Sequence, residues 1–66
     1  MQIQKQIKDI QFDNDGVSEA IVMASAAGWY VGKIDKSEGF IQPYNRYSGY
    51  FATPEEAQKE LSLIHI

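Results

Sequence analysis

The stretch YNRYSGYFATPEEAQKEL, from Tyr44 to Leu61, joins an aromatic turn to the start of a helix and therefore decides the fold class. Its second half carries a helix N-terminus, in which Thr53 is the N-cap, Pro54 takes the first helical position and Glu56 completes a T-x-x-E capping box. Apolar residues then recur at helical spacing. These signals predict a helix that continues to about residue 63.

Strands are predicted before this helix. The segment WYVGKID (29–35) alternates between two faces and predicts a strand, and FIQPY (40–44) is the return strand after the hairpin loop KSEG. Pro43 cannot donate to a ladder, so this return strand is expected at the edge of a sheet. A turn at 45–49 and a short strand at 49–53 complete the segment before the helix.

The N-terminal residues 2–12 are open to two interpretations. Three isoleucines recur at helical spacing, whereas Ile10 and Phe12 alternate with polar residues, as in a half-buried strand. Alanine and leucine are absent here, and isoleucine and phenylalanine favour strands, so we expect a strand. The following DNDG combines residues that tolerate turn geometries, and its spacing does not fit a calcium loop, so we expect a plain turn or a helix cap.

Residues 17–28, VSEAIVMASAAG, also allow two structures. Val17, Ile21 and Ala24 lie on one face of a helix, which Gly28 would end. Alanine favours helices and is depleted in strands, and we therefore expect a helix here. The competing interpretation is a long strand through IVMASAAGWYV that follows a hairpin turn at DNDG.

These segments give the order β-α-β-β-β-α in a single domain of residues 1–66. We expect an α+β fold, with a small antiparallel sheet of about three or four strands and two helices packed on one of its faces. A chain of this size buries only about 60% of the surface that its unfolded form exposes, so its few aromatic residues are needed for the core. The core candidates are Phe12, Trp29, Phe40 and Phe51.

The composition limits the classes of function. The chain has no cysteine and one histidine, His65, next to its C-terminus, which argues against a disulfide or a zinc site. No glycine-rich phosphate loop, nucleophile motif or cluster of acid–base candidates is present, so we expect no enzyme activity, no catalytic residue, no metal and no cofactor. No apolar run is long enough to span a membrane and no signal peptide is present, so we expect a cytoplasmic protein without membrane contact.

The aromatic residues of the second half are the strongest candidates for a functional surface. Seven of the eight aromatic residues lie between Trp29 and Phe51, and several tyrosines surround a turn, where tyrosine and arginine suit an interface hot spot. The alternative is that their rings complete the core. The candidate partner-binding residues are Tyr44, Asn45, Arg46, Tyr47 and Tyr50, with a second, acidic group of Glu55, Glu56 and Glu60 on the last helix.

The net charge of −3 bears on the partner. Each phosphate contact needs a lysine or arginine, so the charge argues against a protein that tracks a nucleic-acid backbone. We expect the partner to be another protein. A small nucleic-acid-associated regulator and a homo-oligomeric structural subunit, for example a homodimer joined through the tyrosines, are the alternatives.

The segments GWYVGK and GFIQPYNRYSGYFATPEEAQKEL, within residues 28–61, resemble small phage and prophage accessory proteins of the anti-defence kind. In these proteins a short sheet carrying GW and SGYF precedes a T/S-x-E-E-A helix. The resemblance implies a phage-encoded inhibitor in the cytoplasm of the host cell. Such an inhibitor, for example an anti-CRISPR, blocks a host defence complex by occupying its surface. The resemblance assigns no functional residue.

Overall fold

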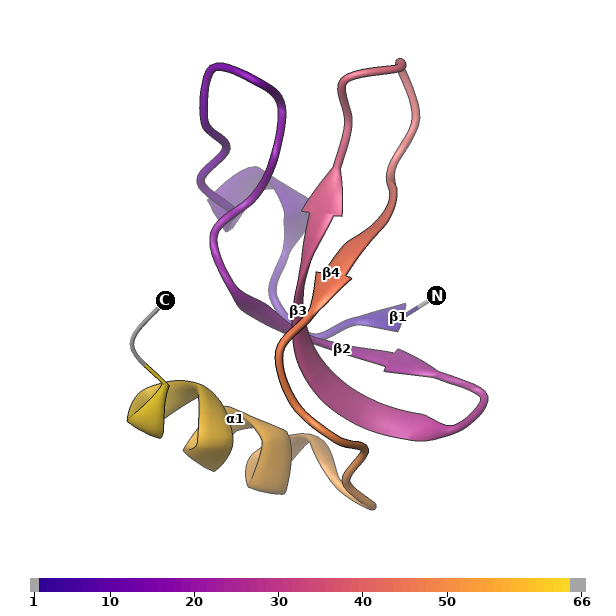
Figure 1. Ribbon diagram of the computed structural model, residues 1–66, viewed down its shortest axis with the longest axis vertical. Coiled ribbons are helices and arrows are strands. Elements are labelled where there is room, and N and C mark those ends of the chain that lie inside the picture. Colours follow the sequence, from indigo (N-terminus) through magenta and orange to yellow (C-terminus); the bar gives the residue numbers. More distant parts are fainter. Residues whose placement is uncertain (1, 65–66) are drawn as a thin grey trace.

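The computed structural model describes residues 2–64, which form one antiparallel sheet and one α-helix (Figure 1). The strands follow one another in the sheet in the order β1-β2-β3-β4. A short 3-10 turn, η1, lies between β1 and β2. The elements are β1 (Gln2–Ile3), η1 (Ile7–Asp9), β2 (Ile21–Ser25), β3 (Gly28–Asp35), β4 (Gln42–Arg46) and α1 (Pro54–Leu63).

The central strand β3 pairs along its length with segments on both of its sides. β2 pairs with its first half, from Ser25 opposite Gly28 to Ile21 opposite Gly32, and β4 pairs with its second half. Both ladders extend beyond the named strands, because Val17 bridges Asp35 and Phe51 bridges Trp29. Figure 1 shows β3 curving from the β2 hairpin at the bottom to the β4 hairpin at the top. The predicted strand at 29–35 is confirmed.

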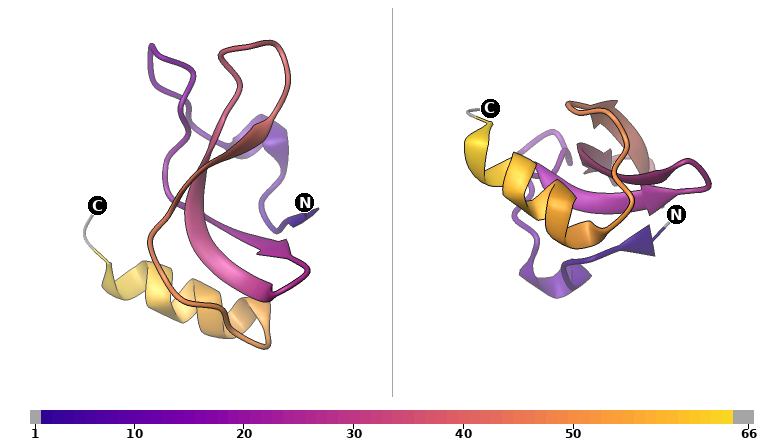
Figure 2. Two further views of the ribbon diagram at one scale, coloured as in Figure 1. Left: turned by 45° about the vertical axis from the view of Figure 1, so that its right-hand side comes forward. Right: turned by 90° about the horizontal axis from the view of Figure 1, so that it is seen from below.

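The sheet is buried on both faces around β2 and β3. Paired residues share a face, so Met23 and Tyr30 lie together, and with Ile21 and Ile34 they form a core cluster. The N-terminal segment covers this cluster with the side chains of Ile3, Ile10 and Phe12. Val22 and Val31 are buried on the opposite face. There α1 packs on β2 and β3 and contributes Ala57, its one buried residue (Figure 2).

The helix predicted over residues 17–28 is wrong, and the competing strand interpretation describes this segment better. Ile21, Val22 and Met23 are all buried, because the strand has a covered face on either side and therefore needs no polar alternation. Pairing with β3 overrides the helix propensity of the alanines. Gly28 has φ of +134°, and a Cβ there would lie 2.8 Å from the Phe51 carbonyl oxygen, so this glycine begins β3 rather than ending a helix.

The DNDG turn is confirmed, and it joins two short paired segments. One Asp13 carboxylate oxygen accepts hydrogen bonds from the Asp15 and Val17 amides at 2.9 and 3.0 Å. Gly16 adopts φ of +82° and donates its amide to the Asp13 carbonyl at 3.1 Å. The chain reverses here, so that Phe12 bridges Ser18 in antiparallel fashion. This is the hairpin turn of the competing interpretation.

The strand predicted over residues 2–12 is wrong in its middle. Only Gln2–Ile3 forms a strand, which pairs with β2, and Ile7–Asp9 forms the 3-10 turn. The chain has to leave the sheet edge and cross one face of the sheet in order to bury Ile10. A continuous strand cannot make this change of direction.

The strand predicted at 40–44 begins and ends two residues later, as β4. Asp35 pairs with Gln42, which leaves 36–41 as the hairpin loop, so Phe40 is exposed and its assignment to the core is wrong. The other core candidates, Phe12, Trp29 and Phe51, are half-buried. The short strand expected at 49–53 is reduced to the bridge between Phe51 and Trp29.

The C-terminal helix is confirmed from Pro54 to Leu63. The Thr53 hydroxyl accepts a hydrogen bond from the Glu56 amide at 3.3 Å, as the capping signal predicted. The α+β class and the antiparallel sheet are confirmed, whereas the order β-α-β-β-β-α fails at its first helix, since residues 2–64 contain one α-helix. No helix within these residues is both long and apolar enough to cross a lipid bilayer.

Candidate partner-binding surface

Strand β4 carries a bulge that turns one tyrosine out of the ladder. Asn45 pairs with Lys33 while Pro43 pairs with Ile34, the next residue of β3, so Tyr44 is the extra residue between two paired positions. Its side chain is 53% exposed. The bulge therefore presents a tyrosine at the edge of the sheet.

The same edge is closed to further strand pairing at Pro43. The Ile34 amide donates to the Ser18 hydroxyl at 2.9 Å, and the Ile34 carbonyl accepts from the Ser18 amide at 2.8 Å. Both polar groups of Ile34 thus point away from β4, so the main chain of Pro43 faces outward in the antiparallel pattern. Proline has no N–H to offer there, and the predicted edge position of Pro43 is confirmed.

The segment after β4 is fixed to β3 by a serine side chain. The Tyr47 amide donates to the Val31 carbonyl at 2.8 Å, and the Val31 amide donates in turn to the Ser48 hydroxyl at 2.9 Å. The ladder resumes where the Trp29 and Phe51 main chains exchange hydrogen bonds of 2.9 and 2.7 Å. Residues 47–50 are therefore anchored at both ends, although they form no regular strand.

This anchoring places Tyr50 beneath Arg46. The Arg46 guanidinium carbon lies 4.8 Å from the centre of the Tyr50 ring, at cation–π distance. The Tyr50 ring meets Tyr30 edge to face, with 5.5 Å between ring centres and an angle of 78°. Arg46 pairs with Gly32 and therefore lies on the same face of the sheet as Tyr30. Gly32 is required at this position, because a Cβ there would overlap the Asn45 carbonyl oxygen.

These side chains surround a hollow of about 260 Å³, which we call the Arg46 pocket. Its lining is Tyr30, Pro43, Tyr44, Asn45, Arg46 and Tyr50. Four of the five tyrosine-turn residues named from the sequence line this hollow, although the Asn45 side chain donates to Tyr47 on the other face of the sheet. Tyr30 and Pro43 were not assigned to a functional surface from the sequence. The alternation that groups Tyr30 with Gly32 on one strand face was the only sequence signal for it.

Tyr30 forms the buried floor of the pocket and is 7% exposed. Burial raises the pKa of its hydroxyl above the ordinary value, with a smaller contribution from Tyr50 and an opposing one from Arg46. At neutral pH the Tyr30 hydroxyl is a hydrogen-bond donor.

Tyr47 lies apart from the Arg46 pocket. Side chains of successive residue pairs along a ladder point to opposite faces of the sheet. The side chains of Lys33 and Asn45 therefore lie on the face opposite that of Arg46. The Asn45 amide nitrogen donates to the Tyr47 hydroxyl at 3.3 Å, and the Lys33 ammonium is 5.8 Å from the centre of the Tyr47 ring. The tyrosine group predicted from the sequence is therefore divided between two faces of the sheet.

The predicted acidic group is also separate from the pocket. Glu55 and Glu56 lie in the first turn of α1 and are exposed, and Glu60 is half-buried further along. Glu56 is engaged locally, because the Thr53 hydroxyl donates to its carboxylate at 3.1 Å. None of the three lines the Arg46 pocket. The structure therefore offers two surfaces, not one combined surface.

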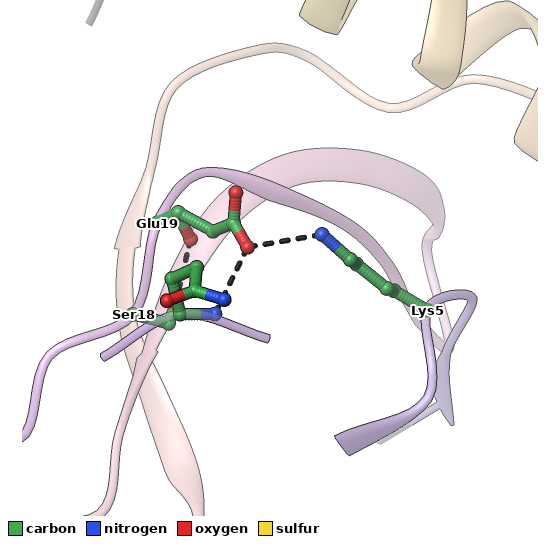
Figure 3. Close-up of polar contacts among 4 residues, drawn as sticks. Lys5, Ser18 and Glu19 are labelled. Atoms are coloured by element: carbon green, nitrogen blue, oxygen red, sulfur yellow. Dashed lines mark hydrogen bonds and ion pairs between the residues drawn. The ribbon is translucent and has the colours of Figure 1, made fainter. Parts of the chain in front are cut away.

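A second hollow, of about 380 Å³, lies between α1 and the N-terminal part of the sheet. At its rim the Glu19 carboxylate accepts hydrogen bonds from the Lys5 ammonium and the Gln11 amide, both at 3.0 Å (Figure 3). The Gln11 hydrogen bond, followed by that of Lys5, lowers the pKa of Glu19 below its ordinary value. The two charges of this hollow therefore satisfy each other.

Arg46 differs in this respect. Among residues 2–64 the Lys5–Glu19 contact is the single ion pair, and the Arg46 guanidinium has no carboxylate within 4 Å. A cation that is held in place without a counter-ion marks the Arg46 pocket as the stronger candidate for binding.

Within the described part of the chain, no three histidine or carboxylate side chains gather closely enough to hold a metal ion. His65 lies outside the described residues. The expectation that the protein is not an enzyme stays a prediction.

Comparison with known proteins adds no assignment. No protein-family model matches this chain, and neither curated proteins nor solved structures show significant similarity to it.

Proposed function

We propose that this protein is a non-enzymatic binding module that occupies the surface of a partner protein with residues 40–50, which comprise β4 and the segments on either side of it. The observation that carries the proposal is the concentration of exposed apolar side chains around one strand. Of the seven large hydrophobic side chains that are exposed within residues 2–64, five belong to residues 40–50. They are Phe40, Ile41, Tyr44, Tyr47 and Tyr50. Tyrosine and arginine in such a group are typical of interface hot spots.

The surface is also organised before any partner arrives. Ser48 and Phe51 fix the segment after β4 to β3, and Tyr50 is held between Arg46 and Tyr30. Side chains that are already ordered lose little entropy on binding, which favours affinity. Together with the resemblance of residues 28–61 to phage accessory proteins, this supports a phage-encoded inhibitor acting in the host cytoplasm. Such an inhibitor blocks a host defence complex, as an anti-CRISPR does.

Single-stranded nucleic acid is a weaker candidate for the ligand. Bases bind by stacking on free aromatic faces beside cations, and three lysine or arginine side chains do lie over rings here. However, the Arg46 guanidinium covers one face of Tyr50, and Tyr30 packs against that ring as well. The Tyr50 ring is therefore engaged with the protein's own side chains.

The test is a plating assay in a bacterial host that carries an active CRISPR–Cas system directed against an infecting phage. Expression of the wild-type chain should restore plaque formation, and the variant Y44A should lose this effect. The exposed Leu63 of α1 supplies a matched control, since L63A also removes an exposed apolar side chain and should act as wild type. Dispersed NMR spectra of both variants would show that each is folded.

The inhibitor proposal would be contradicted if the wild-type chain restored plaque formation neither in hosts with an active CRISPR–Cas system nor in hosts with a restriction system. A Y44A variant that is as active as the wild-type chain would contradict the assignment of the binding surface to residues 40–50.

A further inference from the structure

We propose that the Arg46 pocket receives a single carboxylate side chain, aspartate or glutamate, from an acidic surface of the partner protein. This inference rests on the proposed function and specifies the chemistry of the partner. Its starting point is that the guanidinium of Arg46 is held over Tyr50 at 4.8 Å and has no carboxylate within 4 Å among residues 2–64.

The guanidinium has no carboxylate partner among residues 2–64, and its planar N–H donors match the two oxygens of a carboxylate. The contact with Tyr50, at 4.8 Å from the guanidinium carbon to the ring centre, restricts the arginine side chain before binding. A carboxylate can therefore form a two-point contact without the entropy cost of ordering a flexible arginine.

The walls of the pocket offer apolar contact beside the charge. The rings of Tyr44, Tyr50 and Pro43 line the hollow, so the methylene groups of an aspartate or glutamate side chain can pack against them. Tyr30 lines the same hollow and is buried, and this burial raises the pKa of its hydroxyl, which stays protonated at neutral pH.

Size and charge select one carboxylate over other ligands. Small-molecule pockets usually span about 300–1,000 Å³, and the hollow here measures about 260 Å³, which suits one protein side chain. Arg46 is the only cation that lines it, since Lys33 pairs with Asn45 on the opposite face and lies over Tyr47. A nucleic-acid strand needs a cation for each phosphate contacted, which this pocket lacks.

The experiment is an NMR titration of the isotope-labelled full chain with a short polyglutamate peptide at low salt. The Arg46 side-chain Nε–Hε signal and the backbone amides of the pocket should shift and saturate together. An R46Q variant should bind the peptide at least roughly tenfold more weakly, since hydrogen bonds to charged groups contribute about 1.5–3 kcal/mol. R46K, which keeps the charge but not the planar fork, should fall between the two.

Lys59 supplies a matched control, because K59Q removes one exposed positive charge from α1 and should leave the peptide affinity unchanged. Equal weakening by R46Q and K59Q would overturn the proposal, since it would indicate diffuse attraction. Shifts spread over the whole surface would overturn it too. The proposal would also be overturned if a thymidine oligonucleotide shifted the NMR signals of the pocket residues while polyglutamate did not.

The titration and the plating assay separate the two proposals. If the wild-type chain restores plaques while polyglutamate leaves the pocket signals unmoved, the carboxylate proposal fails and the proposed function stands. If polyglutamate binds at Arg46 while the chain protects no phage, the proposed inhibition fails and the pocket chemistry stands.

Discussion

Two serine hydroxyls complete the hydrogen bonds of the central strand where regular pairing is missing. Ser48 accepts the Val31 amide, and Ser18 accepts the Ile34 amide while its own hydroxyl donates to the Glu19 carbonyl at 2.7 Å. Ser18 is only 2% exposed, so water cannot replace it. These side chains allow β3 to keep its hydrogen bonds although its neighbours on both sides are irregular.

Replacement of Ser18 by alanine should therefore destabilise the protein. The buried Ile34 amide would lose its acceptor, which costs about 1–3 kcal/mol for an unsatisfied buried group. Urea denaturation measures the change. The control is S62A on α1, whose hydroxyl donates to the Gln58 carbonyl at an exposed site and whose loss should cost less than about 0.5 kcal/mol. Equal midpoints for the two variants would contradict the role of Ser18.

Gly32 is the residue on which the register beside the Arg46 pocket depends. A Cβ at Gly32 would overlap the Asn45 carbonyl oxygen and would lie 3.0 Å from the Met23 methyl carbon. G32A should destabilise the fold by about 1–3 kcal/mol, as overpacking does, and should shift the NMR signals of Arg46. Gly49 is the control, because a Cβ there meets nothing within 4 Å. Equal melting temperatures for G32A and G49A would contradict the close approach of β4 to β3 at Gly32.

At the scale of elements, the N-terminal segment is held against the sheet by one carboxylate. Glu19 binds the Lys5 ammonium and the Gln11 amide, so it connects the two sides of η1 to the segment that leads into β2. Figure 3 shows the contact of Glu19 with Lys5. The contact is exposed, and its contribution is correspondingly modest.

This contact predicts a pH dependence. The pKa of Glu19 is lower in the folded than in the unfolded chain, because the Gln11 amide and then Lys5 favour the charged carboxylate. Its stabilisation is therefore fully present above about pH 4.5, the ordinary value, and is lost as the pH falls through the lower folded pKa. Urea midpoints measured between neutral and acid pH should fall less steeply for E19Q than for wild type.

The exposed carboxylate of Glu38, in the β3–β4 hairpin loop, supplies the control for this prediction. E38Q should keep the wild-type slope. A slope for E19Q that matches the wild-type slope would show that Glu19 does not anchor the N-terminal segment.

The elements differ in how far they could be predicted from the sequence. Helix α1 follows from local signals, since its cap, its proline and its apolar spacing lie within one stretch of the chain. Residues 17–28 were assigned to a helix because local propensity favours one, whereas pairing with β3 decides their structure. The Arg46 pocket could be predicted only in part, because the position of Tyr30 beside Arg46 depends on the register and on the bulge at Tyr44.

At the scale of the whole molecule, charge is distributed unevenly between helix α1 and the β3–β4 hairpin. Helix α1 carries three glutamates and one lysine, while the β3–β4 hairpin with its loop carries Lys33, Lys36 and Arg46 against two carboxylates. Opposite ends of this small protein thus present different charges, although the chain as a whole is acidic. A partner would be steered toward one end of it.

The closed edge at Pro43 has a further consequence for a protein with an aromatic outer strand. Open strands with apolar side chains template cross-β growth, in which each added chain hydrogen-bonds to the last. Pro43 removes a donor from the outer edge of β4, and the bulge at Tyr44 breaks its straight repeat. Pro43 and the bulge at Tyr44 therefore make the outer edge of β4 a poor template for an added strand.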